Sequence, residues 1–165
     1  MLAQFIRKKA GKLPVRWLIR IGNVWAPFWG AGIKIVYAAP DYKSMVIEMK
    51  LKWYNRNYVG THFGGSLYAM TDPFYMMMLI NNLGPDYIVW DKSACIDFVK
   101  PGKGTVRAEF NLDDKLLNEV KQKTDTYGKY VFELPVDVKS EDDELIAKVR
   151  KTLYVRRKSA RKGEN

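Results

Sequence analysis

The sequence predicts an α+β domain in which an antiparallel sheet is wrapped around one long central helix. Strand-like segments rich in β-branched and aromatic residues stand before and after a single strongly apolar stretch, residues 64–82. The order is helices, two strands, one long helix, and then four strands with a small helix inserted among them. Helices segregated from a run of strands in this way are typical of an antiparallel α+β fold.

Composition supports one globular domain without a metal or cofactor. The 165 residues are 47% hydrophobic and 28% charged, which suits a single packed core. The lone cysteine, Cys95, and the lone histidine, His62, exclude an internal disulfide and a Cys/His metal cluster. A reducing, cytoplasmic setting fits this composition. We divide the single domain, 1–165, into an N-terminal helical extension (1–32), a core (33–157) and a basic tail (158–165).

The N-terminal extension shows apolar residues at helical spacing. Gly11 and Pro14 are expected to break it into two short helices, followed by an irregular turn over residues 25–32. We expect the second helix to pack on the sheet through its apolar side chains, namely Trp17, Leu18, Ile21 and Trp25. Six cations interrupt the first 20 residues, so there is no signal-peptide core, and no apolar run is long enough to span a membrane.

The remaining elements follow from alternation and turn residues. Strands are expected over residues 33–39 and 44–54, and a long strand over 86–102. A hairpin turn at residues 101–104 should bring the next strand, 105–112, back onto the long one. A short helix should begin after Asp113 and end at Gly128, and a final hairpin should follow over residues 129–158.

The central stretch is apolar on nearly every side, which indicates a buried helix. From Gly64 to Asn82 it would measure about 28 Å. One long helix with several antiparallel strands available to wrap it is the layout of a hotdog fold. Asp72 stands in the middle of this helix, where burying an unpaired carboxylate costs several kcal/mol. Asp72 therefore has a structural partner, caps a helix that restarts at Pro73, or serves chemistry.

The pattern N-x-x-G-T-x-x-G-G-x-x-x-x-x-x-D resembles the active-site segment of hotdog-fold acyl-CoA thioesterases of the phenylacetyl-CoA thioesterase type. It runs from Asn57 to Asp72, and FVKPG at 98–102 resembles the aromatic-x-x-Pro of that family. The whole chain is also similar to bacterial hotdog proteins with a GTxFGGSL signature, over roughly residues 33–157. One position departs: the family His before the two glycines is Phe63 here, and His62 stands one residue earlier. That shift rotates a side chain by about 100°, so we expect His62 to cap or pack locally.

Thioester hydrolysis needs a polarised carbonyl and a nucleophile. The resemblance and the helix start together suggest Gly65 N–H as an oxyanion donor, Asp72 as general base or nucleophile, and Asn57 as an orienting group. Asp91 and Ser93 are expected on one face of the following strand, where they could assist. Lys100 and Lys103 flank a turn where a CoA phosphate could lie. The predicted substrate-binding residues are Thr61, His62, Phe63, Gly64, Ser93, Lys100 and Lys103.

Spacing adds a prediction about assembly. Gly65 and Asp72 would be separated by about 10 Å along one helix, yet both must approach one carbonyl centre. Two antiparallel helices from two subunits can meet this requirement. We therefore expect a twofold homodimer with two composite sites, and a tetramer of such dimers is an alternative.

The net charge of +10 is concentrated at the ends. Residues 1–20 and 148–165 together carry +13, which leaves −3 between them. A nearly neutral body does not favour a nucleic-acid groove, whereas basic ends fit a peripheral membrane contact or a merely solvated surface. The leading hypothesis is a thioesterase acting on an acyl-CoA or acyl-carrier thioester. The alternatives are a non-catalytic acyl-chain-binding or scaffold protein, and a dehydratase, which the misplaced His62 disfavours.

Overall fold

The computed structural model describes residues 14–158, which form one antiparallel sheet and five helices within that range. The strands are β1 (Ile33–Ala38), β2 (Ser44–Lys50), β3 (Tyr87–Phe98), β4 (Thr105–Asn111), β5 (Lys129–Ser140) and β6 (Leu145–Arg157), in the sheet order β1-β2-β4-β5-β6-β3. The helices are α2 (Val15–Val24), α3 (Ala26–Ala31), α4 (Gly64–Ala69), α5 (Phe74–Leu83) and α6 (Asp114–Tyr127).

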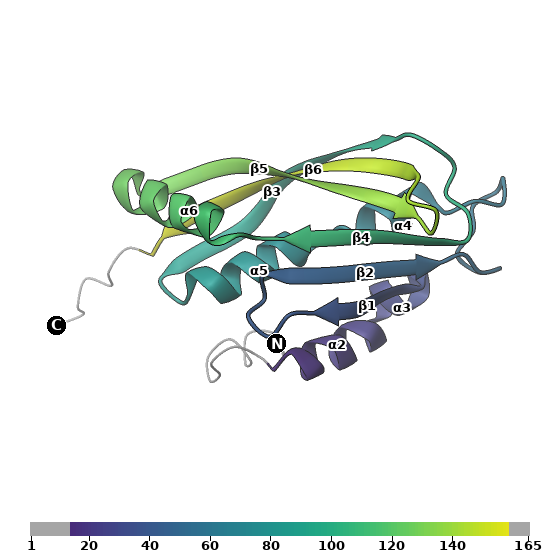
Figure 1. The fold of residues 1–165 in the computed structure, drawn as a ribbon, viewed down its shortest axis with the longest axis horizontal. Coiled ribbons are helices and arrows are strands. Elements are labelled where there is room, and N and C mark those ends of the chain that lie inside the picture. Colours follow the sequence, from purple (N-terminus) through teal and green to yellow (C-terminus); the bar gives the residue numbers. More distant parts are fainter. Residues whose placement is uncertain (1–13, 159–165) are drawn as a thin grey trace.

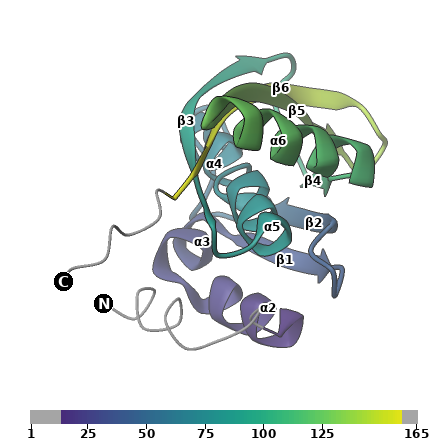
Figure 2. The same cartoon turned by 90° about the vertical axis from the view of Figure 1, so that its left-hand side faces the viewer.

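The sheet curls around α4 and α5, and α6 lies on the same inner side, beside α5 and against β5 and β6 (Figures 1 and 2). Apolar side chains from the inner face of the sheet meet those of α5 in a continuous core. Phe74 and Phe110 lie at its centre, fully buried, with ring centroids 5.2 Å apart. This arrangement confirms the predicted α+β architecture and explains why the central stretch is apolar on nearly every side.

The predicted single helix over residues 64–82 is divided in two. Helix α4 ends at Ala69 and α5 begins at Phe74, with Asp72 and Pro73 in the turn between them. Pro73 lacks the N–H that a continuous helix requires and is tolerated only at a helix start, so the chain turns here. The two helices together occupy the predicted central position, and the break carries Asp72 out of a helix interior.

The helix after Asp113 forms as predicted, whereas one predicted strand pairing does not. Asp113 Oδ1 accepts a hydrogen bond from Leu116 N–H at 2.7 Å, and Gly128 ends α6 with a φ of 74°. The expected hairpin between the third and fourth strands is absent from the described sheet, because β4 pairs with β2 and β5. Strand β3 pairs with β6 instead and lies at the sheet edge.

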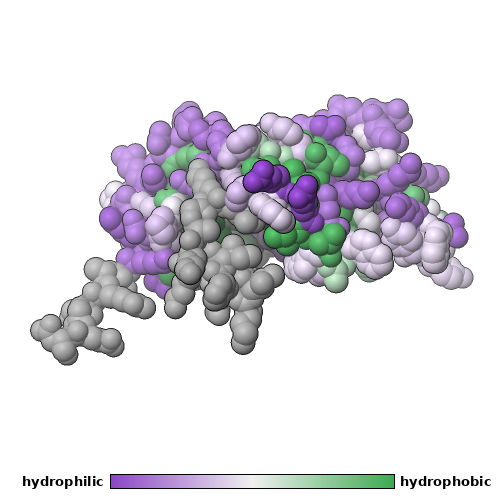
Figure 3. All heavy atoms as spheres, turned by 90° about the horizontal axis from the view of Figure 1, so that it is seen from below, coloured by the Kyte–Doolittle hydropathy of each residue, from purple (hydrophilic) through white to green (hydrophobic). Residues whose placement is uncertain are grey.

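The N-terminal helices lie against β1 with most of their tryptophan surface exposed. Helix α2 buries Leu18, and the Asn23 side chain exchanges two hydrogen bonds with the backbone of Ile35. The predicted irregular turn is instead helix α3, and the predicted helix before Gly11 lies outside the described residues. Figure 3 shows hydrophobic and hydrophilic side chains intermixed on this lower face. Helix α2 packs on the sheet as predicted, but of the four side chains named for it only Leu18 is buried. Those left exposed are Trp17 (45%), Ile21 (41%) and Trp25 (50%).

Candidate functional site

The loop before α4 is organised by the side chain of Asn57. Its Oδ1 accepts hydrogen bonds from the N–H groups of Val59 (3.1 Å) and Thr61 (3.0 Å). Its Nδ2 donates to Thr61 Oγ1 (3.0 Å) and to the His62 carbonyl oxygen (3.2 Å). All four hydrogen-bonding positions of the amide are therefore used inside the loop. In this structure the Asn57 side chain shapes the loop, and its role as an orienting group stays a prediction.

His62 is a buried structural residue, as its shifted position suggests. Its side chain is 2% exposed, and Nε2 lies 3.1 Å from the carbonyl oxygen of Gly104. A carbonyl oxygen only accepts, so Nε2 carries the proton, and Nδ1 is left without a partner among residues 14–158. Burial lowers the pKa of His62 despite the hydrogen bond to Gly104. The imidazole is thus neutral at pH 7 and ties the loop to the segment before β4.

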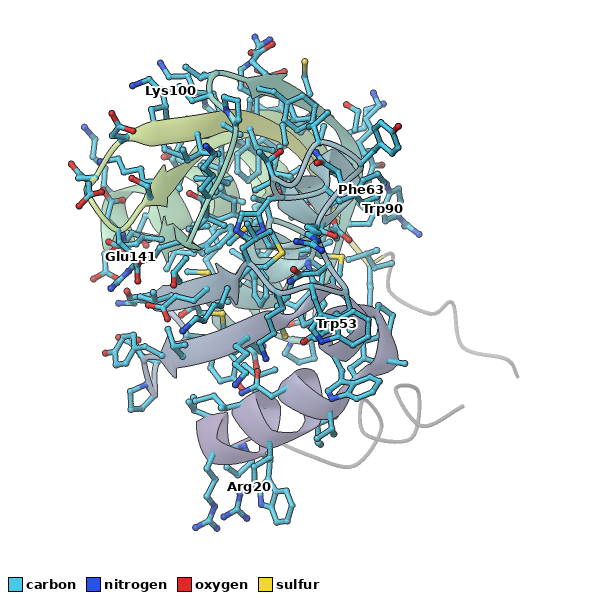
Figure 4. All side chains as sticks on the ribbon, turned by 90° about the vertical axis from the view of Figure 1, so that its right-hand side faces the viewer. Arg20, Trp53, Phe63, Trp90, Lys100 and Glu141 are labelled. Atoms are coloured by element: carbon cyan, nitrogen blue, oxygen red, sulfur yellow. The ribbon has the colours of Figure 1, made fainter. Side chains whose placement is uncertain are left out.

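Two glycines begin α4, and two aromatic rings occupy the space that side chains there would take. A Cβ on Gly65 would lie 2.4 Å from Phe63 Cε1, and a Cβ on Gly64 would lie 3.0 Å from Phe98 Cζ. Both rings are more than half exposed, and Figure 4 shows Phe63 at the molecular surface. Among the described residues no side chain caps α4, so its first turn keeps free N–H groups.

An open groove of about 570 Å³ runs beside this helix start. Its walls come from the loop over residues 57–62, from Gly64 and Leu67 of α4, and from residues 98–103. The groove gathers six of the predicted site residues: Asn57, Thr61, His62, Gly64, Lys100 and Lys103. A larger hollow of about 700 Å³ on the outer face of the sheet is lined mainly by charged residues and includes none of the predicted ones. We therefore place the candidate site at the smaller groove.

Some predicted residues lie elsewhere or are already engaged. Lys100 forms an exposed ion pair with Glu144 at 3.0 Å, which reduces its availability for a phosphate. A β-bulge between Asp91 and Ser93 shifts the register, so the two residues do not share a face as predicted. Asp91 pairs with the inward-facing Leu153 and is largely buried, while Ser93 is exposed. Ser93 is therefore not part of the groove or of the cluster around Asp72.

Asp72 has a buried partner that sequence reasoning missed. Lys151 Nζ donates to Asp72 Oδ1 at 2.7 Å and lies 3.4 Å from Asp91 Oδ2. The Lys151 side chain is 1% exposed, whereas that of Asp72 is 47% exposed. The ring of Tyr68 completes the surroundings, with its centroid 5.5 Å from Nζ. Asp72 is thus neither unpaired nor deeply buried, and it does not cap α5, which begins without a side-chain cap.

The electrostatics of this cluster depend on burial. Burial raises the pKa of Asp91 to about 6; the Lys151 ammonium opposes the rise and the neighbouring Asp72 adds to it. Burial acts to lower the pKa of Lys151, but the hydrogen bond to Asp72 and the charges of both carboxylates outweigh it, and the pKa is raised. The ammonium is therefore fully charged at pH 7. One signal for the inward position of Lys151 exists in the sequence. Lys151 stands two residues from both Val149 and Leu153, so all three side chains lie on the same, buried face of β6.

The sheet, the central helices and the groove define a hotdog fold. A Pseudomonas aeruginosa structure described as a protein of unknown function and probable thioesterase, PA5026, has 19% identity and a TM-score of 0.78, covering 88% of this chain and 97% of its own. Haemophilus influenzae thioesterase HI1161 has 17% identity and a TM-score of 0.64, and the match covers 92% of this chain and 96% of HI1161. Escherichia coli PaaI, from the phenylacetic acid degradation operon, has 15% identity and a TM-score of 0.56, and the match covers 87% of this chain and 94% of PaaI.

The chain belongs to the DUF4442 family, described as a domain of unknown function, whose model matches residues 16–155. No protein of curated function matches it significantly. At these identities the solved structures establish the fold and leave the activity open. Within residues 14–158 we find no helix with the length and apolar character needed to cross a membrane.

Proposed function

We propose that this protein is a thioesterase that hydrolyses an acyl-CoA or acyl-carrier thioester. The observation that carries the proposal is the position of Asp72: a half-exposed carboxylate, held by Lys151, in the turn that directly follows α4. The first turn of the same helix borders an open groove. A carboxylate and free N–H groups are the two functions that thioester hydrolysis requires.

In the proposed reaction the thioester carbonyl lies at the start of α4, and Gly65 N–H donates to its oxygen. Asp72 takes a proton from a water molecule, and the water oxygen attacks the carbonyl carbon. The carbon–sulfur bond then breaks, and the protonated Asp72 returns its proton to the leaving thiolate, which restores the carboxylate. Direct attack by the Asp72 carboxylate is the alternative route through the same residues. Lys103, on the groove wall, is suited to a phosphate of the carrier.

Gly65 lies in the first turn of α4 and Asp72 follows its last turn. Neither lines the groove, although Gly64, the neighbour of Gly65, does. Both groups must lie near 3 Å from one reacting centre, so we propose that each site combines Gly65 of one subunit with Asp72 of the other. The open edge of β3 is suited to a twofold contact, because an unpaired edge can add a strand from a second copy. A homodimer with two composite sites follows.

One observation favours a second candidate, a non-catalytic protein that binds an acyl chain. The Phe63 ring covers Gly65, at the position where the resembled thioesterases have His. A bulky ring there adds apolar surface beside the proposed oxyanion donor. Because Phe63 is 56% exposed, its ring can swing away without disturbing the core, so the thioesterase remains our first choice.

The test is hydrolysis of a panel of acyl-CoA thioesters with short, medium, long and aromatic acyl groups. Asp72→Asn should lower the rate about 100-fold or more on the best substrate, the scale expected for loss of a general base. Asp142→Asn, an exposed carboxylate in the turn between β5 and β6, is the matched control and should keep the parental rate. Equal rates for Asp72→Asn and the parent, with an acyl ligand seen by native mass spectrometry, would support the binding protein instead.

A further inference from the structure

Lys151 occupies a position that the fold alone would fill with an apolar residue. It lies in β6, between β5 and β3, and the flanking inward residues Val149 and Leu153 are 1% and 0% exposed. Burying an ammonium group costs several kcal/mol, and exchanging a buried ion pair for apolar residues of similar volume is often neutral or stabilising. Packing therefore does not explain the lysine, and its charge calls for another role.

The groups around the ammonium come from separate parts of the chain. Tyr68 belongs to α4, Asp72 to the turn after it, and Asp91 to β3. Side-chain exposure increases from Lys151 (1%) through Asp91 (18%) to Asp72 (47%). The ammonium is thus at the buried end of the cluster, and the Asp72 carboxylate is at its solvent-exposed end.

A half-exposed aspartate in a turn is free to change rotamer unless something holds it. The 2.7 Å hydrogen bond from Lys151 Nζ fixes one oxygen, Oδ1, and a charge-assisted bond of this length is among the stronger ones. Asp91, with Oδ2 3.4 Å from the same nitrogen, supplies a second negative group that holds the ammonium in place. A carboxylate misplaced by 1 Å can lose about 100-fold in rate, so such fixation matters for catalysis.

We propose that Lys151 is the positioning residue for Asp72: its ammonium, held by Asp91, binds one oxygen of the Asp72 carboxylate and so directs the other toward the attacking water. This inference rests on the proposed function, because it gives Asp72 the role of base. It adds Lys151 and Asp91 to the machinery, although neither lines the groove. Lys151 acts through Asp72 and makes no contact with the substrate.

Kinetics of two Lys151 variants test the role. Lys151→Met keeps the length of the side chain and removes the charge, and it should lower kcat about 10- to 100-fold with KM changed less than about twofold. Lys151→Arg keeps a donor and should recover part of the rate. The control is Lys148→Met, an exposed lysine on the same strand, which should retain parental kinetics. A folded Lys151→Met with the parental kcat would overturn the proposal.

A second readout needs no substrate. In ¹³C NMR of aspartate carboxyls, the signal absent from Asp91→Asn identifies Asp91, which should titrate near pH 6 in the parent. It should titrate at a higher pH in Lys151→Met, because the ammonium lowers the pKa of Asp91. An unchanged titration would overturn the cluster itself. A further outcome is that the parent hydrolyses no thioester while Asp91 still titrates at a higher pH in Lys151→Met than in the parent. That result would refute the proposed function and would support the contact between Lys151 and the carboxylates.

Discussion

His62 Nε2 lies 3.1 Å from the carbonyl oxygen of Gly104, and this contact joins the loop before α4 to the segment before β4. A second bond, from His62 N–H to the Gly102 carbonyl oxygen at 3.0 Å, reinforces it. Gly102 has little room for a side chain, because a Cβ there would lie 3.1 Å from the imidazole and 3.1 Å from Ile146 Cγ2. The only histidine of the chain therefore holds two walls of the groove together.

The first prediction follows from the burial of His62. Its pKa in the folded protein is lowered, so the unfolded chain, with a pKa near 6.5, binds a proton first as the pH falls. The stability that His62 contributes is present above about pH 6.5 and lost as the pH falls through the folded pKa. His62→Gln should melt at a lower temperature than the parent at pH 7.5, and the gap should narrow at pH 5.5. A gap of the same size at both pH values would contradict this account.

The second prediction concerns Asp91, whose contribution to stability decreases as the pH rises, the opposite of the trend for His62. Its folded pKa is raised to about 6 from 3.8, so between these values the folded protein binds more protons than the unfolded chain. The parent should lose stability as the pH rises through this window, by up to about 3 kcal/mol. Asp91→Asn does not titrate, so its melting temperature relative to the parent should be higher at pH 7.5 than at pH 4.5.

The third prediction concerns the composite site. Gly65→Pro removes the proposed donor N–H in the first turn of α4, where proline is tolerated, whereas Gly65→Ala keeps it. Both add a Cβ that displaces the exposed Phe63 ring. We expect Gly65→Pro to lose most of the activity and Gly65→Ala to retain much more of it. Subunit exchange between Gly65→Pro and Asp72→Asn should restore some hydrolysis, and proven exchange without recovery would indicate that each chain builds its own site.

The fourth prediction concerns the N-terminal face. No acid precedes Asp41, Arg20 points away from the body of the protein (Figure 4), and exposed tryptophan with cations suits an anionic lipid surface. We expect flotation with anionic vesicles that weakens with salt and is absent with neutral vesicles. The double variant Trp25→Ser/Trp29→Ser should lose it, while Trp90→Ser on β3 should not. If the parent does not float with anionic vesicles, the membrane contact is contradicted and the basic residues serve only to keep the protein in solution.

Local chemistry explains which elements were predictable. Alternation of apolar residues gave the strands, and the side-chain cap at Asp113 with the left-handed Gly128 set the ends of α6. The fold class followed from an apolar helix among antiparallel strands. These features depend on residues a few positions apart, so the sequence by itself determined them, together with the offsets of Gly64, Gly65 and Asp72.

The tertiary structure decided what depends on distant contacts. Charge counting grouped Lys151 with a basic C-terminal end, but β6 lies inside the sheet and its alternation turns that lysine inward toward Asp72, 79 residues away. Likewise β4 pairs with β2, although the nearest strand in sequence is β3. The offset of Asn57 suggested an orienting role, and only the folded loop showed that its amide also makes four local hydrogen bonds. Burial and strand partners arise from packing of the whole chain, which no short pattern contains.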